Sequence, residues 1–112
     1  MLIVLRAAGD SALPKYSLTR AATSDLIDIF DYTQDQWGTD QAEKYRQGLT
    51  GCCVLLAEMP SSGRLCENIR PGLHRQEQGK HVVFYRKKPD GTIRISRILH
   101  QSRLPDLERF PR

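Results

Sequence analysis

A single glycine between two long amphipathic patterns limits the folds open to this chain. Apolar residues recur at intervals of three and four from Ala22 to Trp37 and again from Ala42 to Leu56, with Gly38 between the two runs. Such intervals place one apolar stripe along one side of a helix. Because glycine readily adopts the left-handed conformation that ends a helix, Gly38 predicts a stop followed at once by a second helix. The two helices must therefore fold back on each other as an antiparallel hairpin.

Capping and helix-breaking residues in the sequence also predict where both helices begin and end. Thr19 is a suitable cap for a first helix that runs from Arg20 to about Trp37, and Thr39 for a second that ends before Pro60. We expect Trp37 and Tyr45 to anchor the core. The aspartates of the first helix are expected to form its exposed, acidic side; they are Asp25, Asp28, Asp31 and Asp35.

Short strands surround this helical hairpin in the sequence. Tyr16–Leu18 reads as a strand before it, and Gly63–Gln101 as three strands after it. The expected strands are 69–77, interrupted by Pro71-Gly72, then 81–87 and 92–99, with turns at Gln78-Gly79 and Pro89-Asp90-Gly91. Alternation fails near Ile98, which predicts either a bulge or a strand end that is buried on both sides.

The predicted order is β-α-α-β-β-β, an α+β fold. We expect the helical hairpin to pack on one face of a small, mostly antiparallel sheet and to leave the other face free. The main core should join side chains of the helices to those of the sheet: Leu26, Phe30, Leu49 and Leu56 against Val83, Tyr85, Ile93 and Ile95.

Length and composition restrict the chain further. With 112 residues it forms one domain; we expect a weakly ordered arm at residues 1–14, with an edge strand at Leu2–Leu5 as an alternative, and a single domain at residues 15–112. The tail after Gln101 should hold at most one helical turn, around Pro105–Phe110. No apolar run is long enough to span a membrane, and the apolar start is too short for a signal peptide, so we expect a cytoplasmic protein.

The three cysteines predict neither a disulfide framework nor a metal site. Their number is odd, Cys52 and Cys53 are adjacent, and no pair has the spacing of zinc ligands. We expect at least one of that pair to be buried and Cys66 to be exposed. No metal and no cofactor are expected.

Charge is distributed very unevenly. Residues 1–63 contain five Lys/Arg and eight Asp/Glu, whereas residues 64–112 contain twelve and five. A sheet with this excess of positive charge attracts anionic partners by long-range steering. The charge does not distinguish an acidic protein from a nucleic acid.

Several blocks of the sequence together resemble the ParE toxins of the RelE/ParE superfamily. The blocks are YSLTRAATSDLIDIFDYTQDQWG, QAEKYRQGL, SSGRLCENIRPGLHR, HVVFYR and RISRILHQ, in that order. The resemblance covers roughly residues 15–110 and implies the β-α-α-β-β-β fold. It also implies the toxin half of a bacterial type II toxin–antitoxin pair that binds and poisons DNA gyrase, neutralised by a cognate antitoxin.

The RelE branch of the same superfamily implies an alternative, a ribosome-dependent endoribonuclease. RNA cleavage needs a base, an acid and cations for the phosphate, and Arg75, His81, Arg97 and His100 are candidates. His81 begins a strand and His100 ends one, so the two can meet. However, the RelE pattern usually includes a tyrosine near the C-terminus, and this sequence has no tyrosine after Tyr85. A plain nucleic-acid-binding module is the weakest reading, because the sheet offers few exposed aromatic side chains for stacking.

We therefore expect an inhibitory binding protein without catalytic residues. Arg97, His100 and Arg103, at the end of the last strand and beyond it, are the candidates for target binding. The antitoxin should be acidic and partly disordered. It should place an amphipathic helix along the helical hairpin and an acidic segment on the sheet, where the candidate contacts are Arg70, Arg75, Arg86 and Arg94.

Overall fold

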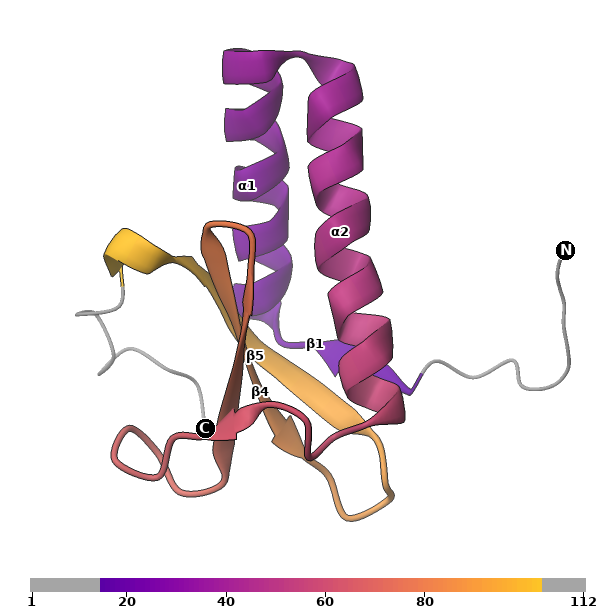
Figure 1. The fold of residues 1–112 in the computed structure, drawn as a ribbon, viewed down its shortest axis with the longest axis vertical. Helices are drawn as coiled ribbons and strands as arrows, with labels where there is room; N and C mark the ends of the chain where they lie inside the picture. Colours follow the sequence, from indigo (N-terminus) through magenta and orange to yellow (C-terminus); the bar gives the residue numbers. More distant parts are fainter. Residues whose placement is uncertain (1–14, 104–112) are drawn as a thin grey trace, which may run out of the picture.

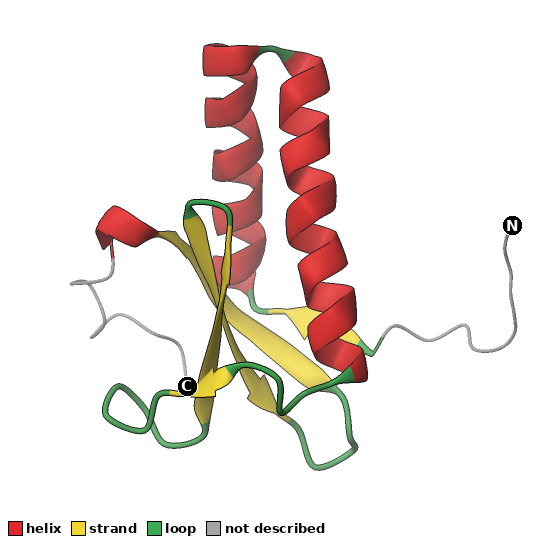
Figure 2. Ribbon diagram, viewed as in Figure 1, coloured by secondary structure: helices red, strands yellow, loops and turns green. Residues whose placement is uncertain are grey.

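Two antiparallel helices stand on one face of a twisted sheet (Figures 1 and 2). The computed structural model describes residues 15–103, so the expectations for residues 1–14 and for Pro105–Phe110 lie outside the described residues. The elements are β1 Tyr16–Leu18, α1 Arg20–Trp37, α2 Thr39–Glu58, β2 Arg64–Leu65, β3 Leu73–Gln78, β4 His81–Lys87 and β5 Ile93–His100. The α+β order predicted from the sequence is confirmed, with the two-residue β2 as an addition.

The helix boundaries follow from local capping. The Oγ1 of Thr19 accepts the backbone N–H of Ala22 at 3.0 Å, which satisfies one of the free donors at the start of α1. Gly38 has a φ of 91° and joins the helices directly. The expectation that Thr39 caps α2 was wrong: Thr39 is the first residue of α2, and Gly38 occupies the cap position without a side-chain hydrogen bond.

The last strand in the sequence lies inside the sheet. The strand order is β1-β5-β4-β3-β2; β1 runs parallel to β5 and the other neighbours are antiparallel. The expected bulge is present on β5, because Ile95 pairs with Tyr85 and Arg97 with Phe84, so that Ser96 has no partner on β4. The residues around Pro71 were wrongly expected to belong to β3: they form turns, and Gly72 has a φ of 76°.

The main core lies between α2 and the sheet face that meets the helices. Leu49 and Leu56 pack there with Val83, Tyr85 and Ile95. Leu26 packs at the edge of this cluster, whereas Phe30 is only half-buried and lies outside it.

Trp37 was wrongly expected to anchor the core, since 72% of it is exposed. Figure 1 shows why: the hairpin rises past the edge of the sheet, so the tip of α1 has no sheet beneath it. The apolar stripe of α1 is therefore longer than the part of the sheet on which α1 can pack.

The opposite face of the sheet was wrongly expected to be free. It carries a second, smaller apolar cluster of Leu73, Val82, Phe84 and Leu99, against which Ile69 packs. Cys66, expected to be exposed, is 5% exposed because its turn folds back against β3, where its N–H donates to the carbonyl of Leu73 at 2.6 Å.

Candidate functional site in the groove beside the helical hairpin

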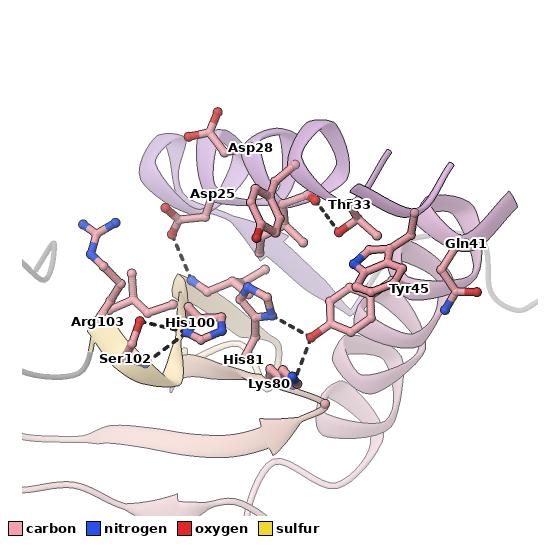
Figure 3. A pocket seen from close by; sticks show the side chains of 16 residues that line it. Asp25, Asp28, Thr33, Gln41, Tyr45, Lys80, His81, His100, Ser102 and Arg103 are labelled. Atoms are coloured by element: carbon pink, nitrogen blue, oxygen red, sulfur yellow. Dashed lines mark hydrogen bonds between the residues drawn. The ribbon is translucent and has the colours of Figure 1, made fainter. Parts of the chain in front are cut away.

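An open groove of about 1090 Å³ lies between the helical hairpin and the ends of β4 and β5. Aromatic and apolar side chains of α1 and α2 form one wall, among them Tyr32, Trp37 and Tyr45. Strand ends and the turn at residues 101–103 form the other wall, with Lys80, His81, His100 and Arg103 (Figure 3). We call this feature the hairpin groove.

The ring of His81 is held by Tyr45 at the floor of the hairpin groove. The Tyr45 hydroxyl accepts the backbone N–H of Lys80 at 3.1 Å and lies 2.6 Å from His81 Nδ1 (Figure 3). The hydroxyl also donates to the carbonyl of Gln78 at 3.4 Å. The Tyr45 hydroxyl and His81 Nδ1 thus share one short hydrogen bond, which fixes the orientation of the ring.

His100 is held in the same way by the turn that follows β5. Its Nδ1 accepts the backbone N–H of Ser102 at 3.1 Å and lies 2.9 Å from the Ser102 hydroxyl. The two imidazole rings face each other edge to face, with centroids 5.2 Å apart. The expected meeting of His81 and His100 is thus confirmed, and each ring is held through its Nδ1.

This arrangement keeps His81 neutral. Burial lowers its pKa from 6.5 to about 4, and the neighbouring His100 contributes in the same direction. At neutral pH the ring is therefore uncharged, and its Nδ1 is already engaged with the Tyr45 hydroxyl. A general acid or base needs a pKa closer to the working pH.

Arg97 does not lie open on the sheet. Its guanidinium makes a two-pronged ion pair with Asp25 of α1, and only 16% of the Arg97 side chain and 12% of the Asp25 side chain are exposed. Asp25 also accepts the backbone N–H of Ile98 at 2.9 Å. The expectation that Asp25 belongs to the exposed acidic side of α1 was therefore wrong.

The other predicted residues fall into two places. His100 and Arg103 both line the hairpin groove, Arg103 from its exposed rim. Arg75, Arg86 and Arg94 lie on the opposite face of the sheet, because Arg75 pairs with Phe84 and Arg86 pairs with both Leu73 and Arg94. Arg70 lies in the turns before β3, where its Nη1 donates to the carbonyl of Ile69.

Sequence reasoning missed the role of Asp25, although a signal was present. Asp25 is three residues after Ala22 and four before Ile29, so it lies on the apolar stripe and not on the acidic side. A carboxylate at such a position predicts a buried partner. The role of Tyr45 as the hydrogen-bond partner of His81 was also missed, since its helical spacing indicated only a core position.

Within residues 15–103, no three His, Cys, Asp or Glu side chains gather in a way that could hold a metal ion. In the same part of the chain, neither helix has the length and apolar character needed to cross a bilayer.

Comparison with known proteins assigns the family. Residues 16–105 match the family described as ParE toxin of type II toxin-antitoxin system, parDE. The chain belongs to the ParE toxin family. It is also 44% identical to toxin ParE1 of Mycobacterium tuberculosis over 87 residues. This match covers 78% of this chain and 89% of that protein. Toxin ParE1 of Caulobacter vibrioides is 42% identical over 87 residues, covering 78% of this chain and 88% of that protein.

A solved structure supports the same assignment for this ParE-family chain. The structure titled "Chromosomal ParDE TA system from P. aeruginosa" is similar to it with a TM-score of 0.65 and 27% sequence identity, over 76% of this chain and 92% of that one. The resemblance seen in the sequence blocks is confirmed, and with it the α+β fold of the family.

Proposed function

We propose that this ParE-family toxin arrests growth in the bacterial cytoplasm by binding DNA gyrase and trapping it on cleaved DNA, without catalysis of its own. The observation that carries the proposal is the family match over residues 16–105. The ParE resemblance implies gyrase, whereas the RelE branch would imply the ribosome.

The chemistry of the hairpin groove supports binding over RNA cleavage. Of the two histidines that a nuclease could use, His81 has a pKa of about 4, and its Nδ1 is engaged by the Tyr45 hydroxyl. The Nδ1 of His100 is engaged by Ser102. Neither ring thus presents a free Nδ1 to a ribose hydroxyl, and its low pKa makes His81 a weak general base.

The rim of the hairpin groove is the proposed target-binding surface. His100 lies there at the end of β5 and Arg103 on the exposed turn that follows, where a large partner can approach. Arg97 belongs to this surface only indirectly, since its ion pair with Asp25 positions the end of β5. We therefore assign direct contact to Arg103 and His100, and a positioning role to Arg97.

A cognate antitoxin is the second proposed partner, and it should be acidic and partly disordered when free. The apolar wall of the hairpin groove suits the apolar side of an amphipathic helix. An acidic extended segment would then lie on the other side of the sheet, near Arg70, Arg75, Arg86 and Arg94. Complementary charge at that second contact raises the association rate more than the affinity.

The proposal is tested with purified toxin, gyrase and plasmid DNA, by measuring supercoiling and the yield of cleaved DNA. We expect inhibition, and we expect Arg103→Glu to weaken it strongly. Lys44→Glu, an equal charge reversal at an exposed position of α2, is the matched control and should leave inhibition unchanged. Cleavage of ribosome-bound messenger RNA that disappears in His100→Ala would instead establish the nuclease alternative.

A further inference from the structure

The two layers of this molecule carry opposite charge. The helices, residues 20–58, contain three Lys/Arg and seven Asp/Glu, whereas residues 64–103 contain ten and three. An anionic partner approaching from solution is therefore repelled by the helical layer and attracted by the sheet. Such a partner is expected to bind where the arginines of the sheet layer are exposed together.

Four arginines share the sheet face that points away from the helices. The register pairs Arg64 with Arg75 and Arg86 with Arg94, and it places Arg75 beside Phe84 on that face. We call the surface of Arg64, Arg75, Arg86 and Arg94 the basic face. It spans β2, β3, β4 and β5, so its outermost arginines are about three strand spacings, roughly 14 Å, apart.

Arg86 and Arg94 are directly opposite each other on neighbouring strands, an arrangement in which like charges destabilise a sheet. Their hydrogen-bond partners are neutral: Arg86 donates to the carbonyl of Pro71 at 2.5 Å and Arg94 to the Ser17 hydroxyl at 3.3 Å. Among residues 15–103, neither has a carboxylate within ion-pair distance. The buried Nε of Arg86 also lacks a hydrogen-bond partner. Two adjacent guanidinium groups are thus available to an anion.

The other end of the basic face is partly neutralised. One carboxylate, that of Glu77, bridges Arg64 at 2.9 Å and Arg75 at 2.8 Å. Since Glu77 pairs with Val82 across β3 and β4, it lies on the same face as the arginines. The four arginines and this glutamate leave a net charge of three on the basic face.

The shape of the basic face selects the kind of anion. Phe84 is fully buried, with the Arg75 guanidinium 5.8 Å from its ring centroid, so this ring is not available for stacking on a base. What remains is a row of forked cations suited to phosphate oxygens. Duplex DNA presents such oxygens at high density and needs no stacking partner for backbone contact.

We propose that in the free toxin the basic face binds the phosphate backbone of duplex DNA without sequence preference. Its role in the cell rests on the proposed function: it would hold the toxin against the DNA that gyrase has engaged, and an acidic antitoxin segment would cover the same arginines. DNA binding itself does not depend on gyrase.

Fluorescence anisotropy of a labelled DNA duplex, titrated with the whole chain at several salt concentrations, tests the proposal. With a net charge of three, the slope of log K against log salt should be about −2.7. This corresponds to about 40-fold weaker binding at 200 mM than at 50 mM salt. The Arg86→Gln, Arg94→Gln double variant should lower the slope to about −0.9.

Glu77→Gln provides the sharpest variant, because it removes the carboxylate that, among residues 15–103, bridges two arginines of the basic face. It should tighten DNA binding and steepen the slope to about −3.6. The matched control is Arg20→Gln, Lys44→Gln, which removes two exposed charges from the helical layer and should leave the slope unchanged.

Three results would overturn the proposal: no binding at 50 mM salt, equal loss of slope in the control variant, or weaker binding by Glu77→Gln. A fourth result would replace the DNA site with a peptide site. It is displacement of the labelled DNA by a polyglutamate peptide at a far lower concentration of negative charges than unlabelled DNA requires. If the chain binds DNA as described yet leaves gyrase unaffected, the proposed function fails and this inference stands.

Discussion

Asp25 and Arg97, separated by 72 positions in the sequence, clamp the first helix onto β5. Arg97 Nε and Nη2 lie 2.7 and 2.8 Å from the two carboxylate oxygens, and the carboxylate also accepts the N–H of Ile98 at 2.9 Å. Because β1 pairs only with residues 93–95 of β5, Asp25 occupies the stretch of strand edge that β1 leaves uncovered.

Removal of this clamp should destabilise the protein. Asp25→Ala leaves the mostly buried Arg97 without its ion pair, and we expect a loss of about 2–4 kcal/mol in the free energy of unfolding. Urea denaturation followed by circular dichroism measures it. Asp28→Ala, at an exposed position one turn away, should change stability by less than about 0.5 kcal/mol; equal effects of the two variants would contradict the clamp.

The cap of α1 makes a second connection to β5. The Thr19 hydroxyl accepts the N–H of Ala22 and donates to the carbonyl of Ser96 at 2.8 Å, with Thr19 8% exposed. Thr19→Ala should cost about 1–3 kcal/mol, since it removes the cap and leaves a buried carbonyl unpaired. Thr19→Ser should recover most of this in thermal denaturation. The comparison fails if Thr23→Ala, which removes only a bond within α1, costs as much.

The core should respond unequally to truncation of its two helices. Leu49 is fully buried against the sheet, so Leu49→Ala is expected to cost about 2–5 kcal/mol. Phe30 is half-buried beside Leu26 and Arg46 at the outer surface of the hairpin, and Phe30→Ala should cost roughly 1–2 kcal/mol. Chemical denaturation of both variants checks the ranking, and a larger loss for Phe30→Ala would mean that the hairpin packs on the sheet differently.

His81 predicts a specific loss of stability in mild acid. Its folded pKa of about 4 lies below the ordinary value of 6.5, so between these values the unfolded chain binds a proton that the folded chain does not. Stability should therefore be complete above pH 6.5 and fall as the pH drops toward 4. Melting temperatures from pH 7 to pH 5 test this.

His81→Gln should flatten that pH dependence, because glutamine does not titrate. His74→Gln is the control, since His74 lies elsewhere on the sheet, in β3. An unchanged pH profile in His81→Gln would show that another group controls acid stability.

Local patterns were sufficient to predict most of the fold. Thr19 and Gly38 fix the ends of α1 through capping and backbone conformation, and alternation along 81–87 correctly separates Val83 and Tyr85 from Val82 and Phe84. The length over which α1 packs on the sheet was not predictable in the same way. The apolar stripe of α1 does not indicate where the sheet beneath it ends, so Trp37 was predicted to be a core residue although it lies at the exposed tip.

The candidate site was predicted only where strand ends determine it. His81 and His100 meet because one begins β4 and the other ends β5, and antiparallel pairing brings those positions together. The Asp25–Arg97 pair and the Tyr45–His81 bond join elements that are far apart in sequence, and their geometry depends on how the hairpin is seated. The position of Arg97 near the end of the last strand therefore suggested that it contacts a target, whereas in the fold it pairs with Asp25 and holds α1.

The position of β5 inside the sheet affects when the toxin becomes active during its own synthesis. A ribosome releases β1 and the helical hairpin first, but β1 has no partner until β5, which lies between β1 and β4, has left the ribosome. The sheet and the Asp25 clamp therefore form late and together, from contacts of long sequence separation. A nonsense or frameshift mutation anywhere before residue 93 removes β5 from the interior of the sheet, so loss of the toxin's fold is an easy route by which a host escapes it.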